Sequence, residues 1–146
     1  MTFPILMRHE ARGTGVNAVS TPLLIDTDVM VDFLRGNPKA VALVTEHSPR
    51  ILLSAIVVAE LYAGVRGEEE LQILDSLISL FRILPVSPEL ARQGGLLKNE
   101  YAKSHGVGLA DAIIAASAKA EQAELKTLNT KHYPMFKGLR APYRKP

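Results

Sequence analysis

The segment Leu23-Leu24-Ile25-Asp26-Thr27-Asp28-Val29-Met30-Val31-Asp32-Phe33-Leu34 decides the fold class. Its uninterrupted apolar run ends in the carboxylate of Asp26, and a helical pattern begins immediately afterwards. This order predicts a short buried strand that leads directly into a helix. Open α/β sheets bind ligands at the carboxyl ends of their strands. Asp26 is therefore the first candidate site residue.

Strand and helix patterns alternate along the rest of the chain. Further strands are predicted over 51–53, 82–86 and 125–128, and helices over 29–35, 38–47, 55–65, 68–81, 88–105 and 107–122, with a last loop or short strand in the tail. Such alternation is typical of a parallel sheet covered by helices on both faces. We expect a three-layer α/β/α sandwich around a central, mostly parallel sheet of four to five strands.

The chain divides into two unequal parts. Residues 1–22 lack hydrophobic periodicity and contain Gly13 and Gly15, which predicts a flexible lead-in. The apolar cluster over 3–7 is too short for the core of a signal peptide. Residues 23–146 contain no internal repeat or linker and are predicted to form a single domain.

Composition narrows the class of protein. With 47% hydrophobic and 22% charged residues, the chain is typical of globular proteins rather than disordered ones. It has no cysteine, so a disulfide framework and a thiolate metal site are excluded, which fits a reducing cytoplasm. No apolar run approaches the roughly 18 residues that a membrane span requires, so no membrane partner is expected.

The basic charge is concentrated near the end of the chain. The formal net charge is only +2, but residues 126–145 contain six Lys and Arg side chains and no acid. A segment of one sign can attract phosphates, whereas the alternative is an ordinary solvated surface.

Two more acids lie in helical patterns. The residues one turn away from Glu60 are apolar or small, with no cation among them, so its charge is expected to be shielded and to need a partner. Asp111 has a similar setting in an alanine-rich helix. A distant ion pair or a snorkelling side chain remains an alternative for Glu60, and helix capping remains one for Asp111.

Helix capping also competes for the acids of the first segment. Thr27 or Asp28 is better placed than Asp26 to cap the following helix, and Asp28 is interpreted mainly as that cap. Asp26 is then free to join Glu60 and Asp111 at the carboxyl edge of the sheet. Hard oxygen ligands of this kind suit Mg²⁺ or Mn²⁺.

Four stretches of the chain carry a family resemblance. They are Leu24-Ile25-Asp26-Thr27-Asp28 with Asp32-Phe33-Leu34-Arg35-Gly36, Ser54-Ala55-Ile56-Val57-Val58-Ala59-Glu60-Leu61, Gly108-Leu109-Ala110-Asp111-Ala112-Ile113-Ile114-Ala115-Ala116, and Thr127-Leu128-Asn129-Thr130-Lys131-His132-Tyr133. In this order, over residues 22–144, the chain resembles PIN-domain proteins, specifically VapC-type toxins of type II toxin–antitoxin pairs.

The resemblance implies that Asp26, Glu60 and Asp111 are the catalytic, metal-binding acids. Many family members have a fourth acid in the last stretch, where this chain has Asn129 and His132. Either residue is a candidate for the metal surroundings or for substrate contact, and a loop cap is the alternative for His132. The hydroxyls of Thr27 and Ser54 are candidates for supporting roles, with helix capping as the alternative.

The implied activity is that of a Mg²⁺- or Mn²⁺-dependent endoribonuclease, in which the metal activates a water for attack on the RNA phosphodiester. The same resemblance implies a homodimer and a VapB-type antitoxin partner.

Two other functions remain open. Asp26-Thr27-Asp28 also imitates the opening motif of haloacid-dehalogenase phosphatases, with Asp26 as nucleophile. The missing fourth acid suits a non-catalytic module that binds RNA or protein.

Overall fold

A computed structural model describes residues 21–144 of the chain. Its sheet contains four parallel strands in the order β3-β2-β1-β4. The strands are β1 (Leu23–Ile25), β2 (Ile51–Ser54), β3 (Arg82–Leu84) and β4 (Glu124–Lys126). The predicted α/β sandwich is confirmed, while most of the predicted lead-in lies outside the described residues.

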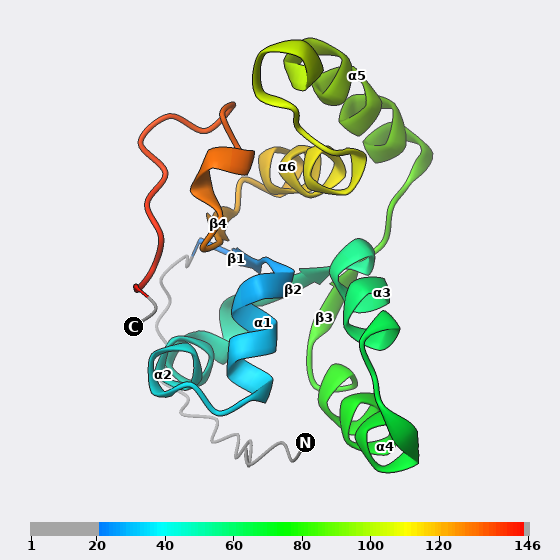
Figure 1. Ribbon diagram of the computed structural model, residues 1–146, viewed down its shortest axis with the longest axis vertical. Helices are drawn as coiled ribbons and strands as arrows, with labels where there is room; N and C mark the ends of the chain where they lie inside the picture. The colour runs from blue at the N-terminus through cyan, green and yellow to red at the C-terminus, as the bar shows by residue number, and fades with distance from the viewer. Residues whose placement is uncertain (1–20, 145–146) are drawn as a thin grey trace.

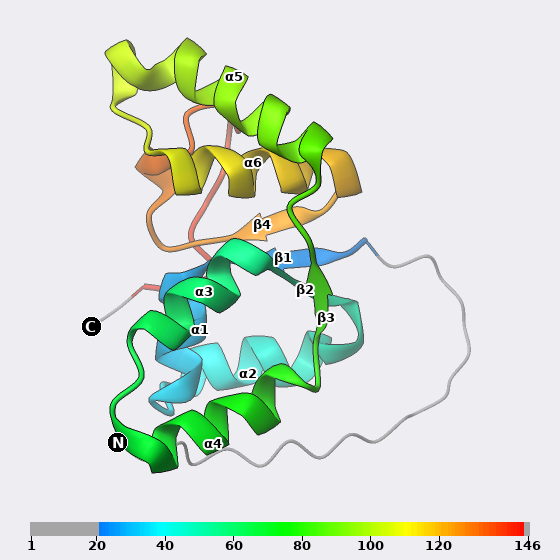
Figure 2. The same cartoon turned by 90° about the vertical axis from the view of Figure 1, so that its right-hand side faces the viewer.

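Helices cover both faces of the sheet. They are α1 (Thr27–Leu34), α2 (Pro38–His47), α3 (Ala55–Ala63), α4 (Gly67–Ile78), α5 (Pro88–His105) and α6 (Leu109–Glu121), with 3₁₀ turns η1 (Ser48–Arg50) and η2 (Thr130–His132). Figures 1 and 2 show α5 and α6 on one side of the strands and α1, α2 and α4 on the other. Within 21–144, no helix is long and apolar enough to cross a membrane.

The apolar run of β1 forms the centre of the core. Leu24 and Ile25 are fully buried, because β1 lies between β2 and β4 and both of its faces are covered by helices. This environment explains why the run has no polar alternation. The chain proceeds from β1 to β2 and β3 on one side and returns to β4 on the other, so the carboxyl ends of β1 and β4 flank a topological switch point.

The local capping signals are largely confirmed. Asn37 caps α2, Ser54 caps α3 and Ser87 caps α5, each through a side-chain oxygen that accepts a backbone N–H. The C-cap of α3 is Gly64, so this helix is shorter than the predicted 55–65. The tail contains the turn η2 and no strand over its described part, to residue 144.

One capping prediction is wrong, and one capping alternative is excluded. Asp26, rather than Thr27 or Asp28, caps α1, because its extended backbone leaves the sheet at that point and its carboxylate accepts from Thr27 N. The helix therefore begins at Thr27, and Asp28 lies in its first turn. Asp111 lies in the first turn of α6 and does not cap it, since Gly108 occupies the N-cap position.

Helices α5 and α6 pack closely at one glycine. A Cβ added to Gly94 would lie 2.9 Å from the Ile113 Cα and 2.6 Å from its Cγ1. The same atom on the neighbouring Gly95 would meet nothing within 4 Å. Only the first glycine is therefore required for helix packing.

We expect Gly94→Ala to lower the free energy of unfolding by about 1–3 kcal/mol, because a packed helix pair resists an added methyl group. Gly95→Ala is the matched control and should raise it by about 0.5–1 kcal/mol, since alanine favours the helix. Urea unfolding of the two variants measures both changes. Equal effects would contradict the close packing.

Candidate active site

Asp26 lies at the carboxyl end of β1 and is held by three donors. Its Oδ1 accepts from Thr27 N at 2.8 Å. Its Oδ2 accepts from Thr127 Oγ1 at 2.8 Å and from the Tyr133 hydroxyl at 2.9 Å. Asp26 is 6% exposed as a whole residue, so these bonds hold a buried carboxylate in one orientation.

The Tyr133 hydroxyl joins two of the three predicted acids. It lies 3.2 Å from Asp111 Oδ1 as well as 2.9 Å from Asp26 Oδ2. Burial and the nearby charges of Asp26 and Asp111 raise the pKa of Tyr133, so the phenol keeps its proton and acts as the donor. Because a phenol has one proton, it cannot satisfy both carboxylates fully at once.

Sequence reasoning missed Tyr133 as a site residue. Its aromatic ring belongs to the last of the four stretches, and a buried Tyr generally needs a partner for its hydroxyl. That rule predicts a polar partner for the Tyr133 hydroxyl but does not identify which residue it is. The partners lie 107 and 22 residues away along the chain, so the fold alone identifies them.

Glu60 lies on α3 at the rim of the site. Its carboxylate accepts a hydrogen bond from the hydroxyl of Thr27, the residue after Asp26. The predicted shielding of Glu60 is wrong, because the residue is exposed. Val57 and Leu61 are the buried residues of α3, and the small neighbours Ala63 and Gly64 are exposed with Glu60.

Like charges crowd the site around Asp111. Burial raises the pKa of Asp111, the Asp26 charge raises it further, and Glu60 adds to the effect. His132 opposes this shift, because its Nδ1 lies 3.2 Å from Asp111 Oδ2. The structure thus places His132 beside one of the predicted acids, with its side chain half exposed.

Asp28 organises the loop after β4. Its Oδ2 accepts from Leu128 N at 3.0 Å and from Asn129 Nδ2 at 3.1 Å. A carboxylate only accepts, so the Asn129 amide presents its nitrogen to Asp28 and keeps its oxygen available as an acceptor. Burial first, then the Asp26 charge, raises the pKa of Asp28 to about 6.

Ser54 caps helix α3, which was the alternative to a supporting role in the site. Its Oγ accepts from Ile56 N at 3.0 Å, and the residue is fully buried at the end of β2. Thr27, by contrast, contacts Glu60 directly and links it to the backbone of the Asp26 segment.

The donor set suits a hard divalent cation by its chemistry. Asp26 and Asp111 present oxygens to one shared hydroxyl, and their mutual repulsion is what a cation would offset. Within residues 21–144, however, no three His, Asp or Glu side chains are close enough together to surround an ion. The chemistry of the side chains therefore suits a divalent cation, but Glu60 lies at the rim of the site and does not surround the ion position together with Asp26 and Asp111.

Replacing Tyr133 by Phe should lower the free energy of unfolding in the presence of a chelator by about 1–3 kcal/mol, because two partly buried carboxylates lose a shared donor. The matched control is Tyr101→Phe, whose hydroxyl has no hydrogen-bond partner among the described residues. Its cost should stay within about 0.5 kcal/mol. Similar midpoints for the two variants in thermal unfolding would refute the bridging role.

Comparison with known proteins places this geometry in a family. The model of the PIN domain matches residues 23–135. Ribonuclease VapC19 of Mycobacterium tuberculosis is 43% identical, covering 82% of this chain and 98% of the relative, and Ribonuclease VapC10 of the same organism is 34% identical, covering 85% and 95%. A toxin–antitoxin complex from Klebsiella pneumoniae contains a similar chain at 29% identity, with a TM-score of 0.74 and coverage of 84% and 99%. The chain belongs to the PIN domain family.

Proposed function

We propose that the protein is a metal-dependent endoribonuclease that acts in the cytoplasm as the toxin of a type II toxin–antitoxin pair. The observation that carries this proposal is the meeting of Asp26 and Asp111 on one hydroxyl at the switch point of the sheet. Glu60 lies one contact further out, through Thr27. The names of the two ribonuclease relatives support RNA as the substrate class. The toxin–antitoxin complex that contains a similar chain supports an antitoxin partner, which we propose to be of the VapB type.

In this proposal Asp26, Glu60 and Asp111 hold Mg²⁺ or Mn²⁺. The bound ion would supply the activation of water and the neutralisation of phosphate charge that phosphodiester cleavage requires. Thr127 and Tyr133 orient the Asp26 carboxylate, so the site is preorganised before RNA arrives. In the last stretch, where many family members have a fourth acid, His132 contacts Asp111 and Asn129 contacts Asp28.

The C-terminal cations suit the RNA backbone. Lys131, Lys137, Arg140 and Arg144 are all exposed, and none forms an ion pair within the described part of the chain. Contacts between such side chains and phosphates release counterions, so RNA binding should weaken as salt rises.

A non-catalytic RNA-binding module is the second candidate function. Among residues 21–144, no three acidic or histidine side chains are close enough together to surround an ion. This spacing favours the non-catalytic module. Calorimetry with Mn²⁺ separates the two, because a module of this kind would show no site that depends on the carboxylates. The phosphatase interpretation has no supporting observation among residues 21–144.

Asp26→Asn should reduce metal-dependent RNA cleavage by at least about 100-fold, because it removes one ligand charge from the site. It should also weaken Mn²⁺ binding in calorimetry. Glu69→Gln is the control, since Glu69 is an exposed acid in the first turn of α4, with normal activity expected. Wild-type cleavage rates in the Asp26→Asn variant would rule out the proposed chemistry.

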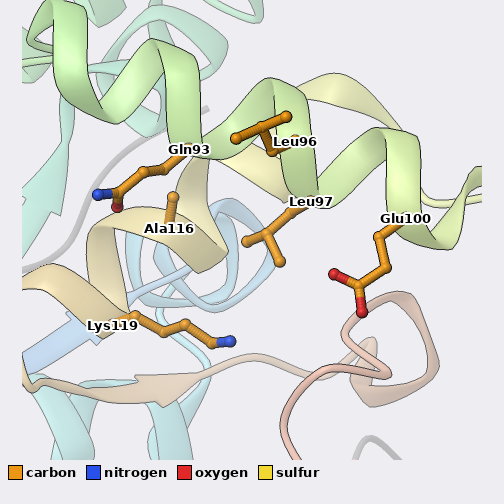
Figure 3. A pocket seen from close by; sticks show the side chains of 6 residues that line it. All are labelled: Gln93, Leu96, Leu97, Glu100, Ala116 and Lys119. Carbon is orange, nitrogen blue, oxygen red and sulfur yellow. The ribbon is translucent and has the colours of Figure 1, made fainter.

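We also propose that the protein forms a homodimer, for which a candidate face lies between α5 and α6. A shallow hollow of about 230 Å³ there is lined by Gln93, Leu96, Leu97, Glu100, Ala116 and Lys119 (Figure 3). Leu96 is 52% exposed, which is high for a large apolar side chain. The face also carries an acid and a cation, which a copy related by two-fold symmetry could pair.

Sedimentation velocity tests this face. Leu96→Glu should shift the protein towards monomer, because it places a charge in an apolar contact. Leu80 is equally exposed, at 51%, just beyond the end of α4, so Leu80→Glu serves as the control and should leave the sedimentation coefficient unchanged. A monomeric wild type would refute the dimer itself.

A further inference from the structure

A second hollow opens beside the acids. It encloses about 520 Å³ and is lined by Asp28, Leu128, Asn129, Ala141, Tyr143 and Arg144. Three segments build it: the first turn of α1, the loop after β4, and the C-terminal segment that passes β4 towards α1 and α2 (Figure 1). Its volume lies within the range of pockets that take small organic groups.

The aromatic wall of this hollow is held in place. The Tyr143 hydroxyl donates to Asp32 Oδ2 on α1 at 2.8 Å. Burial, the hydrogen bond to Asp32 and the Asp32 charge raise the pKa of Tyr143, so the phenol stays protonated and the bond persists. The ring is therefore a fixed planar surface, half-buried, within the C-terminal segment.

The polar wall presents an acceptor and a cation. Asp28 fixes the nitrogen of the Asn129 amide, which leaves the amide oxygen as the acceptor on this exposed side chain. Arg144 is exposed and forms no ion pair with any acid between residues 21 and 144. A flat ring, a carbonyl acceptor and a guanidinium with no acid partner over residues 21–144 thus share one hollow. Asp28, which also lines it, is two residues from the candidate catalytic Asp26.

We propose that this hollow is a nucleobase subsite that receives a base adjacent to the scissile phosphate of RNA. The base stacks on the Tyr143 ring, the Asn129 oxygen accepts from its exocyclic amino group, and Arg144 contacts a neighbouring phosphate. Adenine, cytosine and guanine carry such an amino group and uracil does not, so the subsite disfavours uracil. This proposal rests on the proposed nuclease function and deepens it.

The surroundings favour RNA over a protein segment as the occupant. Asp28 is two residues from Asp26, and Asn129 is two residues from Thr127, which donates to Asp26. A base in the hollow would therefore place its own backbone near the acids. The flanking C-terminal cations have the sign that a phosphodiester backbone requires.

The first test varies the RNA and leaves the protein unchanged. Each nucleotide flanking the mapped cut is replaced in turn by its analogue lacking the amino group, inosine for guanosine or purine riboside for adenosine. At one position the KM of the wild type should rise by about 2- to 10-fold, the effect of one lost hydrogen bond, with little change in kcat. An abasic nucleotide there should raise it further, because stacking is lost as well.

The second test varies the ring. Tyr143→Leu should raise KM by about tenfold on intact RNA, the order expected for loss of one stacked base, and should have little effect on the abasic RNA. Tyr143→Phe keeps the ring but loses the hydrogen bond to Asp32, so its KM on intact RNA should rise less than that of Tyr143→Leu. Urea unfolding of both Tyr143 variants verifies that they are folded.

Arg144→Gln should raise KM equally on intact and abasic RNA, because Arg144 is proposed to contact a phosphate and not the base.

Several results would overturn the subsite. If Tyr143→Leu raised KM equally on intact and abasic RNA, the ring would support the fold and would not stack on a base. If none of the base analogues changed KM, base recognition would be excluded. Unchanged RNA kinetics in a Tyr143→Leu variant that loses its co-purified antitoxin would assign the hollow to a protein segment. A wild type that cleaves no RNA would refute the nuclease proposal itself.

Discussion

The site depends on the parallel pairing of β1 with β4. Leu23 to Ile25 pair with Glu124 to Lys126, and the ladder is extended by Asp26 N donating to Lys126 O at 2.9 Å. This register sets Thr127 beside Asp26 at the carboxyl ends of the two paired strands. A slip of one residue would turn Thr127 to the other face of the sheet and remove its hydrogen bond. The chemistry of residues 101 positions apart is therefore a consequence of backbone pairing.

The same pairing concentrates negative charge. Asp26, Asp28 and Asp111 are drawn together, and burial, followed by the charge of Asp26, raises the pKa of Asp28 to about 6 and also raises the pKa of Asp111. A carboxyl pKa that is higher in the folded protein means that stability is greater in acid and falls as pH rises towards and through that value. The fold tolerates this cost because hydroxyl and amide donors hold the carboxylates, and a bound cation would offset it further.

Local signals in the sequence predicted most of the fold, because they report interactions between near neighbours. The caps Asn37, Ser54 and Ser87 each bond to an amide within three residues, and the apolar run of β1 reflects burial on both faces. The errors concern interactions that no short window contains. The exposure of Glu60 depends on which side of α3 meets the core, and the hydroxyl of Tyr133 finds its partners only when β4 docks.

The acids of the site and the cations around it come from different parts of the chain. The candidate catalytic acids precede residue 112, whereas the chain after β4 contains cations without acids. That part of the chain donates to Asp26 through the Thr127 and Tyr133 hydroxyls, and to Asp28 through the Asn129 amide. Donors next to the acids stabilise their ionised form, and exposed cations further out create a rim of positive potential. A polyanion approaching the acids would first meet the cations, which offset the repulsion it would otherwise encounter. Because the Tyr143 bond to Asp32 ties this segment to α1, the rim is part of the folded domain.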